Sequence, residues 1–179
     1  MSLLAFRDAV VNGIKAALPD VKSIEPHGGR FDEKELRTFG AAAPAVRVAL
    51  LELTGVEGLQ GATAMKIRCA AFVATRSTPA LPRDKAALAI VTTLAATIPD
   101  NDWGLNNTQN PQAVRAANLY SGGVDSAGIA LWAVTWDQQI NLVETDPATL
   151  DVFQTFRTEY DIGQTPDTEK PADEITLEQ

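Results

Sequence analysis

The stretch of this sequence that most looks capable of chemistry is SGGVDS, residues 121–126. A glycine-rich loop can hold a phosphate because backbone N–H groups approach the anion closely, usually between a strand and the start of a helix. Here the residues after the loop have the pattern of another strand, and only 53 residues follow Ser126. This context favours a hairpin turn in which Gly122 and Gly123 supply unusual backbone angles.

The other residue types that could do chemistry are few and scattered. His27 is the only histidine and Cys69 the only cysteine, so a zinc site, a two-histidine metal motif or a Cys–His pair has little to build on. The HGGR segment that ends at Arg30 lacks the full pattern of a nucleotide loop, and Cys69 falls on an apolar strand face. Glu33 and Glu35 fit the first turn of a helix better than a catalytic pair. The sequence therefore predicts no catalytic residue, no metal and no cofactor.

The elements that would position these residues begin with a helix. Residues 3–18 are predicted to form it because apolar side chains recur at helical spacing before Pro19: Leu3, Phe6, Val10, Ile14 and Ala17. Residues 21–25 predict a short strand, and the PHGGRF segment predicts a turn at its two glycines. Asp32 is placed to cap a second, short helix.

Two long strands are predicted next, over residues 44–54 and 63–76, joined by a glycine-rich hairpin connection. The second strand alternates, with one apolar face and a face that carries Lys66, Arg68 and Arg76. We therefore expect an antiparallel pair with one dry face. Arg47, Lys66 and Arg68 would form a basic surface, either merely solvated or available to an acidic partner.

A further helix is predicted between Pro82 and Pro99, followed by strands in the runs 113–120 and 128–143. The buried stripe of that helix is expected to contain Leu88, Val91, Ala95 and Ile98. Short connections between neighbouring strands predict an α+β fold. We expect a mostly antiparallel four-stranded sheet with helices packed on it, and an extended acidic C-terminal arm.

Charge divides the chain into two parts. Residues 144–179 hold ten acidic and two basic residues, a net charge of −8, whereas residues 1–143 hold thirteen of each and are neutral. We therefore expect a domain over 1–143 and an acidic arm over 144–179. Such an arm repels phosphate backbones, which argues against a protein that binds nucleic acid by bulk attraction. No run approaches a membrane span of roughly 20 apolar residues, and the first residues do not have the pattern of a signal peptide.

Several separated segments together resemble a known family. They are LPDVKSIEPHGGRFDEKEL, APAVRVALL, NLYSGGVDSAGIALWAVTWDQQI and a short F..F...YDI pattern before the acidic end. In this order they resemble the Mu-like phage and prophage tail completion, or tail terminator, proteins. The resemblance spans nearly the whole chain and accounts for the SGGVDS string without a nucleotide.

The resemblance implies a non-enzymatic structural protein of the virion. Copies would close into a ring, expected to be hexameric, on the end of the tail tube and would join it to the head–tail connector. Assembly would take place in the cytoplasm of the bacterial host, without a membrane, and DNA would pass through the lumen without sequence-specific binding. A ring needs a heterologous interface, which an arm could extend. We expect Leu150, Phe153, Phe156 and Tyr160 to pack on a neighbouring subunit or the tube, and the acidic terminus to lie against Arg47, Lys66 and Arg68.

Two alternatives remain open at this point. One is a neck or baseplate adaptor of the same virion. The other, more distant, is an enzyme of the ATP pyrophosphatase type that would use SGGVDS to bind the nucleotide.

Overall fold

The computed structural model describes residues 1–21, 23–56, 63–106, 108–119, 121–126, 128–142, 155–159 and 172–176. The chain forms two compact units, Met1–Glu144 and Thr145–Gln179, and each is described by itself. None of the helices in these described ranges combines the length and the apolar character that a membrane crossing requires.

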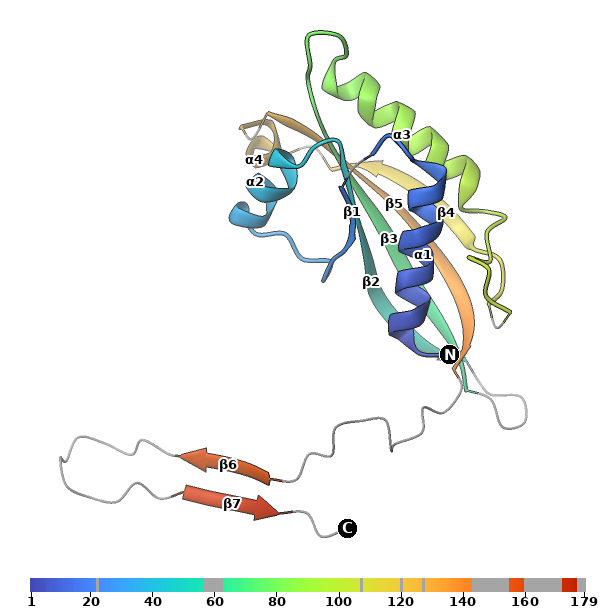
Figure 1. Ribbon diagram of the computed structural model, residues 1–179, viewed down its shortest axis with the longest axis vertical. Helices are drawn as coiled ribbons and strands as arrows, with labels where there is room; N and C mark the ends of the chain where they lie inside the picture. The colour runs from blue at the N-terminus through green and yellow to red at the C-terminus, as the bar shows by residue number, and fades with distance from the viewer. Residues whose placement is uncertain are drawn as a thin grey trace, which may run out of the picture. The chain divides into compact units, whose positions relative to one another are not determined.

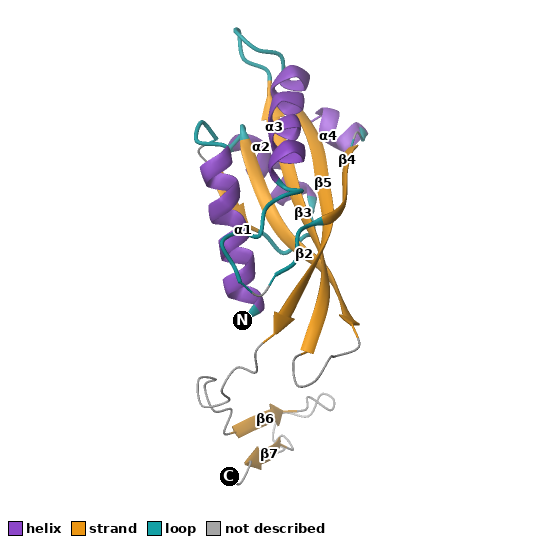
Figure 2. Ribbon diagram, turned by 90° about the vertical axis from the view of Figure 1, so that its right-hand side faces the viewer, coloured by secondary structure: helices purple, strands orange, loops and turns teal. Residues whose placement is uncertain are grey.

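The larger unit has the predicted α+β class and is built around a five-stranded mixed sheet with the strand order β1-β2-β3-β5-β4 (Figures 1 and 2). The prediction of four mostly antiparallel strands is correct for β2 to β5. The short strand predicted over residues 21–25 is β1, which the four-stranded prediction leaves out of the sheet and which joins it as a fifth strand, parallel to β2. The elements are α1 (Leu3–Ala17), β1 (Ser23–Pro26), α2 (Glu33–Ala41), β2 (Ala45–Val56), β3 (Thr63–Arg76), α3 (Arg83–Thr97), β4 (Gln112–Asn118), α4 (Gly122–Ser126) and β5 (Ile129–Leu142).

The strand directions explain why helices cover both faces of this sheet. Two connections join parallel strands through a helix: β1 to β2 through α2, and β3 to β4 through α3. Such crossovers are nearly always right-handed. Both connections move in the same direction across the sheet, but β1 and β2 run opposite to β3 and β4. Right-handed crossovers therefore place α2 and α3 on opposite faces. Figure 1 shows this arrangement, with α1 and α3 on one side of the sheet and α2 and α4 on the other.

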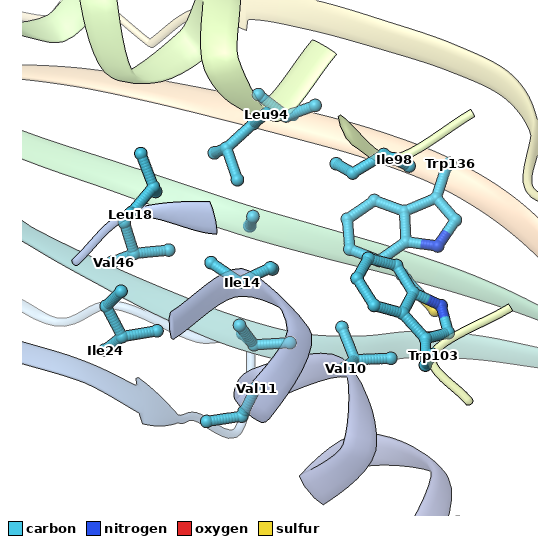
Figure 3. Packing of buried hydrophobic residues seen from close by; sticks show 14 of the residues in the cluster. Val10, Val11, Ile14, Leu18, Ile24, Val46, Leu94, Ile98, Trp103 and Trp136 are labelled. Carbon is cyan, nitrogen blue, oxygen red and sulfur yellow. The ribbon is translucent and has the colours of Figure 1, made fainter. Parts of the chain in front are cut away.

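The first face carries the larger core, under α1 and α3. Phe6, Val10 and Ile14 of α1 are fully buried, as is Leu94 of α3. They pack against the inward side chains of the central strands, including Cys69. Figure 3 shows Val10, Ile14 and Leu94 in this packing. Ser2 begins α1 by accepting a hydrogen bond from the backbone N–H of Ala5 at 3.1 Å, the capping contact that serine favours.

The second face also has a core, which corrects the prediction of one dry face. Phe39 of α2 and Val124 of α4 are buried against Ala70, Phe72 and Ala74 of β3. The α2 helix is held in place at its start by a capping box, because Asp32 and Glu35 each accept a hydrogen bond from the other's backbone N–H. The predicted cap at Asp32 is therefore confirmed. Only the part of this face beyond α2 and α4 is left for the charged residues.

The predicted stripe of α3 is partly wrong. Val91 and Ile98 are buried, but Leu88 is 50% exposed and Ala95 is also exposed, while Ala87, Ile90 and Leu94 take their places against the sheet. The helix is rich in alanine and apolar on more than one side, so its periodicity does not select a single buried face.

A buried polar network joins the 101–109 loop to β5. The indole N–H of Trp103 donates to Oε1 of Gln138 at 2.8 Å, and that of Trp136 donates to the same atom at 3.3 Å. The amide of Gln138, which is 1% exposed, donates to the backbone oxygens of Gln109 at 2.8 Å and Asn101 at 3.4 Å. All four partners of this side chain are therefore internal, and the loop is fastened to the strand.

In the smaller unit, β6 (Thr155–Glu159) and β7 (Ala172–Thr176) form a two-stranded antiparallel sheet that pairs Phe156 with Ile175. Leu150, Phe153 and Tyr160 lie outside the described residues, and of the four predicted contact residues in the arm only the backbone of Phe156 is described.

Candidate functional site

The SGGVDS segment forms a short helix, α4, instead of the predicted hairpin turn. Gly122 and Gly123 lie in this helix and are not among the residues with positive φ, whereas Gly128 after the helix has a φ of 69°. The prediction that Gly122 and Gly123 supply unusual angles is therefore wrong, and among the described residues of this segment the left-handed position is Gly128.

The polar groups of this segment are used inside the fold. Asp125 accepts a hydrogen bond from the guanidinium of Arg83, at the start of α3, at 2.6 Å. The Ser126 hydroxyl donates to the backbone oxygen of Gly122 at 2.7 Å, and the Ser121 hydroxyl accepts from the backbone N–H of Val124 at 3.3 Å. The side chain of Val124 is buried in the second core. These contacts give the motif residues a packing role that joins α4 to α3 and to the sheet.

A charged cluster occupies the open part of the second face. Nζ of Lys66 lies 3.0 Å from Oδ2 of Asp137, and Nε of Arg68 donates to Oδ1 of the same carboxylate at 3.1 Å. Nη1 of Arg68 also donates to Glu52 on β2 at 2.9 Å. The hydrogen bond from Lys66, assisted by Arg68, holds the pKa of Asp137 below its ordinary value although desolvation acts in the opposite direction. The cluster is thus a cross-strand network in which both predicted basic residues already have acidic partners.

Arg47 belongs to a different cluster. Its guanidinium lies 3.1 Å from Glu25, donates to the Ser23 hydroxyl at 2.9 Å and stands 5.1 Å from the centre of the Phe39 ring. In the strand register Arg47 lies opposite Phe72, four residues from Arg68, a separation of about 13 Å along the strand. The structure therefore brings Lys66 and Arg68 together and leaves Arg47 apart, so the three do not make one basic patch.

Two depressions adjoin these clusters. One of about 430 Å³ lies beside Arg47 and is lined by His27, Phe31 and Phe39. In it the His27 and Phe31 rings stack 4.3 Å apart, and the imidazole Nδ1 accepts a hydrogen bond from the backbone N–H of Gly29 at 3.0 Å. His27 therefore has a structural contact that completes a turn. The other depression, of about 290 Å³, lies between Arg68 and Arg115.

Cys69 is fully buried in the first core, as the sequence predicted, and burial raises the pKa of its thiol. Over the described part of the chain, no three His, Cys, Asp or Glu side chains gather in a way that could hold a metal ion.

Sequence reasoning missed Asp137, Arg115 and the open edges of the sheet. Asp137 has a visible signal, because it is an acid inside the long apolar run of β5. Its two partners are 69 and 71 residues away and become apparent only from the register between β3 and β5. The exposed edges depend on strand order, which no local pattern specifies.

Neither a comparison with protein-family models nor a search of curated proteins finds a match to this chain. Of the segments that carry the resemblance, the three in the larger unit coincide with β1 and the start of α2, with the first half of β2, and with α4 and β5.

Proposed function

We propose that this chain is a structural virion protein of the tail terminator or tail completion type. Its copies form a ring on the end of the phage tail tube and join the tube to the head–tail connector. The observation that carries the proposal is the ordered resemblance of four segments to Mu-like tail completion proteins. A neck or baseplate adaptor of the same virion is the nearest alternative.

The internal contacts of SGGVDS support a structural role. Asp125, Ser121 and Ser126 all bond to atoms of the same chain, and Val124 is part of a core. A phosphate-binding use of the segment would have to compete with the 2.6 Å contact between Asp125 and Arg83. The segment therefore has a sufficient explanation in packing, without a ligand.

Charge supports the expected path of DNA. The larger unit is neutral through residue 143, and the excess of eight negative charges lies in residues 144–179. A lumen lined by this acidic segment would repel phosphates and release no counterions, so DNA would pass without binding. The partners proposed are further copies of this chain, the tail tube protein and the connector protein, within the virion.

The arm keeps its proposed role of reaching a neighbouring subunit or the tube through Leu150, Phe153, Phe156 and Tyr160. Its acidic end has fewer partners than the sequence suggested, since Lys66 and Arg68 already contact Asp137. If the arm bound at this cluster, its carboxylates would have to compete with Asp137 for Lys66 and Arg68, or share them with it. Both cations are exposed, so such ion pairs would contribute little. We therefore expect the aromatic residues to contribute more to arm docking than the acidic ones do.

Electron microscopy of the purified full-length protein in negative stain tests the proposal. Closed rings of uniform diameter that stack on isolated tail tubes are the expected result. A field of single subunits at high protein concentration, with no density added to tubes, would contradict it. ATP–pyrophosphate exchange is the parallel assay for the enzymatic alternative, with Asp125→Ala as the control, and we expect no exchange from either protein.

A further inference from the structure

We propose that the two outer edges of the five-stranded sheet are complementary docking surfaces for a second copy of this chain, so that copies join head to tail. The inference deepens the proposed function, because it names the surfaces through which ring subunits would meet. One edge is β4, the last strand of the sheet. The other is the outer side of β2 beyond the end of β1.

The β4 edge has an open strand and an exposed apolar side chain above it. Among the described residues, β4 pairs only with β5, at the margin of the sheet (Figure 2). Nearly all of its side chains are exposed. On α3, Ala87, Val91 and Leu94 point at the sheet, and Leu88 lies about 100° further round the helix. For a right-handed helix that runs antiparallel to β3, this rotation turns Leu88 toward β4 and away from α1. Leu88 is 50% exposed there.

The β2 edge has the same two features. β1 pairs with Ala45–Val48, so from Ala49 onward β3 is the one partner strand of β2 within the described part of the chain. In this part of β2, Leu53 is 41% exposed. Leu4, near the start of α1, is 59% exposed and lies on the flank of that helix turned away from α3. An unpaired strand with exposed leucines is a surface that a monomer normally protects with charges or short strands.

The two edges carry complementary side chains on each face of the sheet. Leu4, Leu53 and Leu88 all lie on the face covered by α1 and α3, so contact between edges would bring apolar side chains together. Arg115 of β4 and Glu52 of β2 both lie on the opposite face. Among the described residues Arg115 has no ion-pair partner, and the Glu52 side chain is 56% exposed beside Arg68. Joining the edges would therefore also bring opposite charges together.

Strand direction favours this pairing over a symmetric one. β4 runs antiparallel to β2 within the sheet, so a second copy in the same orientation would add its β2 to β4 as an antiparallel neighbour. Pairing of β4 with β4 about a two-fold axis would place one Arg115 near the other with no acid between them, which is unfavourable. Different surfaces that meet head to tail form a heterologous contact, the kind that generates rings.

Matched lysine substitutions in the full-length chain test the inference by sedimentation velocity. Leu53→Lys damages the β2 edge, Leu88→Lys damages the β4 edge, and Leu81→Lys is the control because Leu81 is 42% exposed in the β3–α3 connection, away from both edges. We expect wild type and the control to assemble and each edge variant to remain monomeric. An equimolar mixture of the two edge variants should form a one-to-one dimer, because each retains the edge that the other lacks.

Assembly of either edge variant alone to the wild-type size would overturn the inference, as would a mixture that stays monomeric. Recovery of dimers in the mixture also shows that both variants are folded. Rings formed by wild type and by both variants would overturn this inference and leave the proposed function intact. If wild type forms open-ended oligomers and the mixture forms one-to-one dimers, the result would support docking through the two edges and would contradict a terminator ring. A wild-type chain that stays monomeric would overturn both.

Discussion

Replacement of Gln138 by methionine tests the buried network that fastens the 101–109 loop to β5. Methionine fills a similar volume but removes the oxygen that accepts both indole N–H groups and the amide that donates to two backbone oxygens. At 1% exposure the site is closed to solvent around this side chain. The Trp103 and Trp136 donors would then be buried without an acceptor.

The expected loss of stability follows from these hydrogen bonds. A buried donor left unsatisfied costs about 1–3 kcal/mol. The indole of Trp103 makes the shorter hydrogen bond, 2.8 Å, and that of Trp136 the longer, 3.3 Å. Most of the lost stability should therefore come from the unsatisfied Trp103 donor. We expect Gln138→Met to lower the free energy of unfolding by about 2–4 kcal/mol, allowing for some relaxation of the loop.

Urea denaturation followed by circular dichroism measures this change without relying on the tryptophans that are perturbed. Gln139→Met is the matched control, because the next side chain points to the other face of the sheet and should alter stability by no more than about 0.5 kcal/mol. Trp103→Phe removes one donor, so its cost should be smaller in the Gln138→Met background than in wild type. Equal effects of the two methionine variants would refute the reasoning.

Three other perturbations have defined outcomes. Gly13→Ala places a methyl group 2.5 Å from Cε3 of the buried Trp103 ring and should cost about 1–2 kcal/mol in urea denaturation, whereas Gly122→Ala meets no atom within 4 Å and should cost nothing. The pKa of Asp137 is lowered by folding. The contribution of this carboxylate to the free energy of unfolding is therefore present above about pH 4 and is lost as the pH falls through the folded-state pKa. Asp137→Asn should therefore be less stable than wild type at pH 7, with a difference that shrinks toward pH 2; a constant difference would contradict this. A chain ending at Glu144 should fold but fail to form rings in negative stain, and normal rings would show that the arm is dispensable.

The elements with one clear pattern were predictable from sequence. β3 was predicted at its observed bounds, Thr63–Arg76, because its apolar and charged residues alternate, and the cap at Asp32 followed from residue type. The second core was not predictable in the same way. Ala70 and Phe72 alternate on the same side as Lys66 and Arg68, so one face of one strand is dry at one end and charged at the other. Which end is covered depends on where α2 and α4 pack.

The candidate site was less predictable than the fold. The type and exposure of Lys66 and Arg68 could be foreseen, but their shared partner Asp137 depends on a cross-strand register between distant segments. The conformation of SGGVDS was predicted wrongly because two adjacent glycines are typical of turns, while the burial of Val124 and the Asp125–Arg83 contact stabilise a helical turn instead.

The central position of β3 has a consequence for how the molecule unfolds. Its odd-numbered residues from Cys69 to Val73 build one core, and the even-numbered residues from Ala70 to Ala74 build the other. Neither core can unfold while the other stays intact, because unfolding of either core would displace the β3 backbone that both cores share. The amides of this strand should consequently exchange with deuterium only through global opening, and the α1–α3 and α2–α4 layers should lose their protection together.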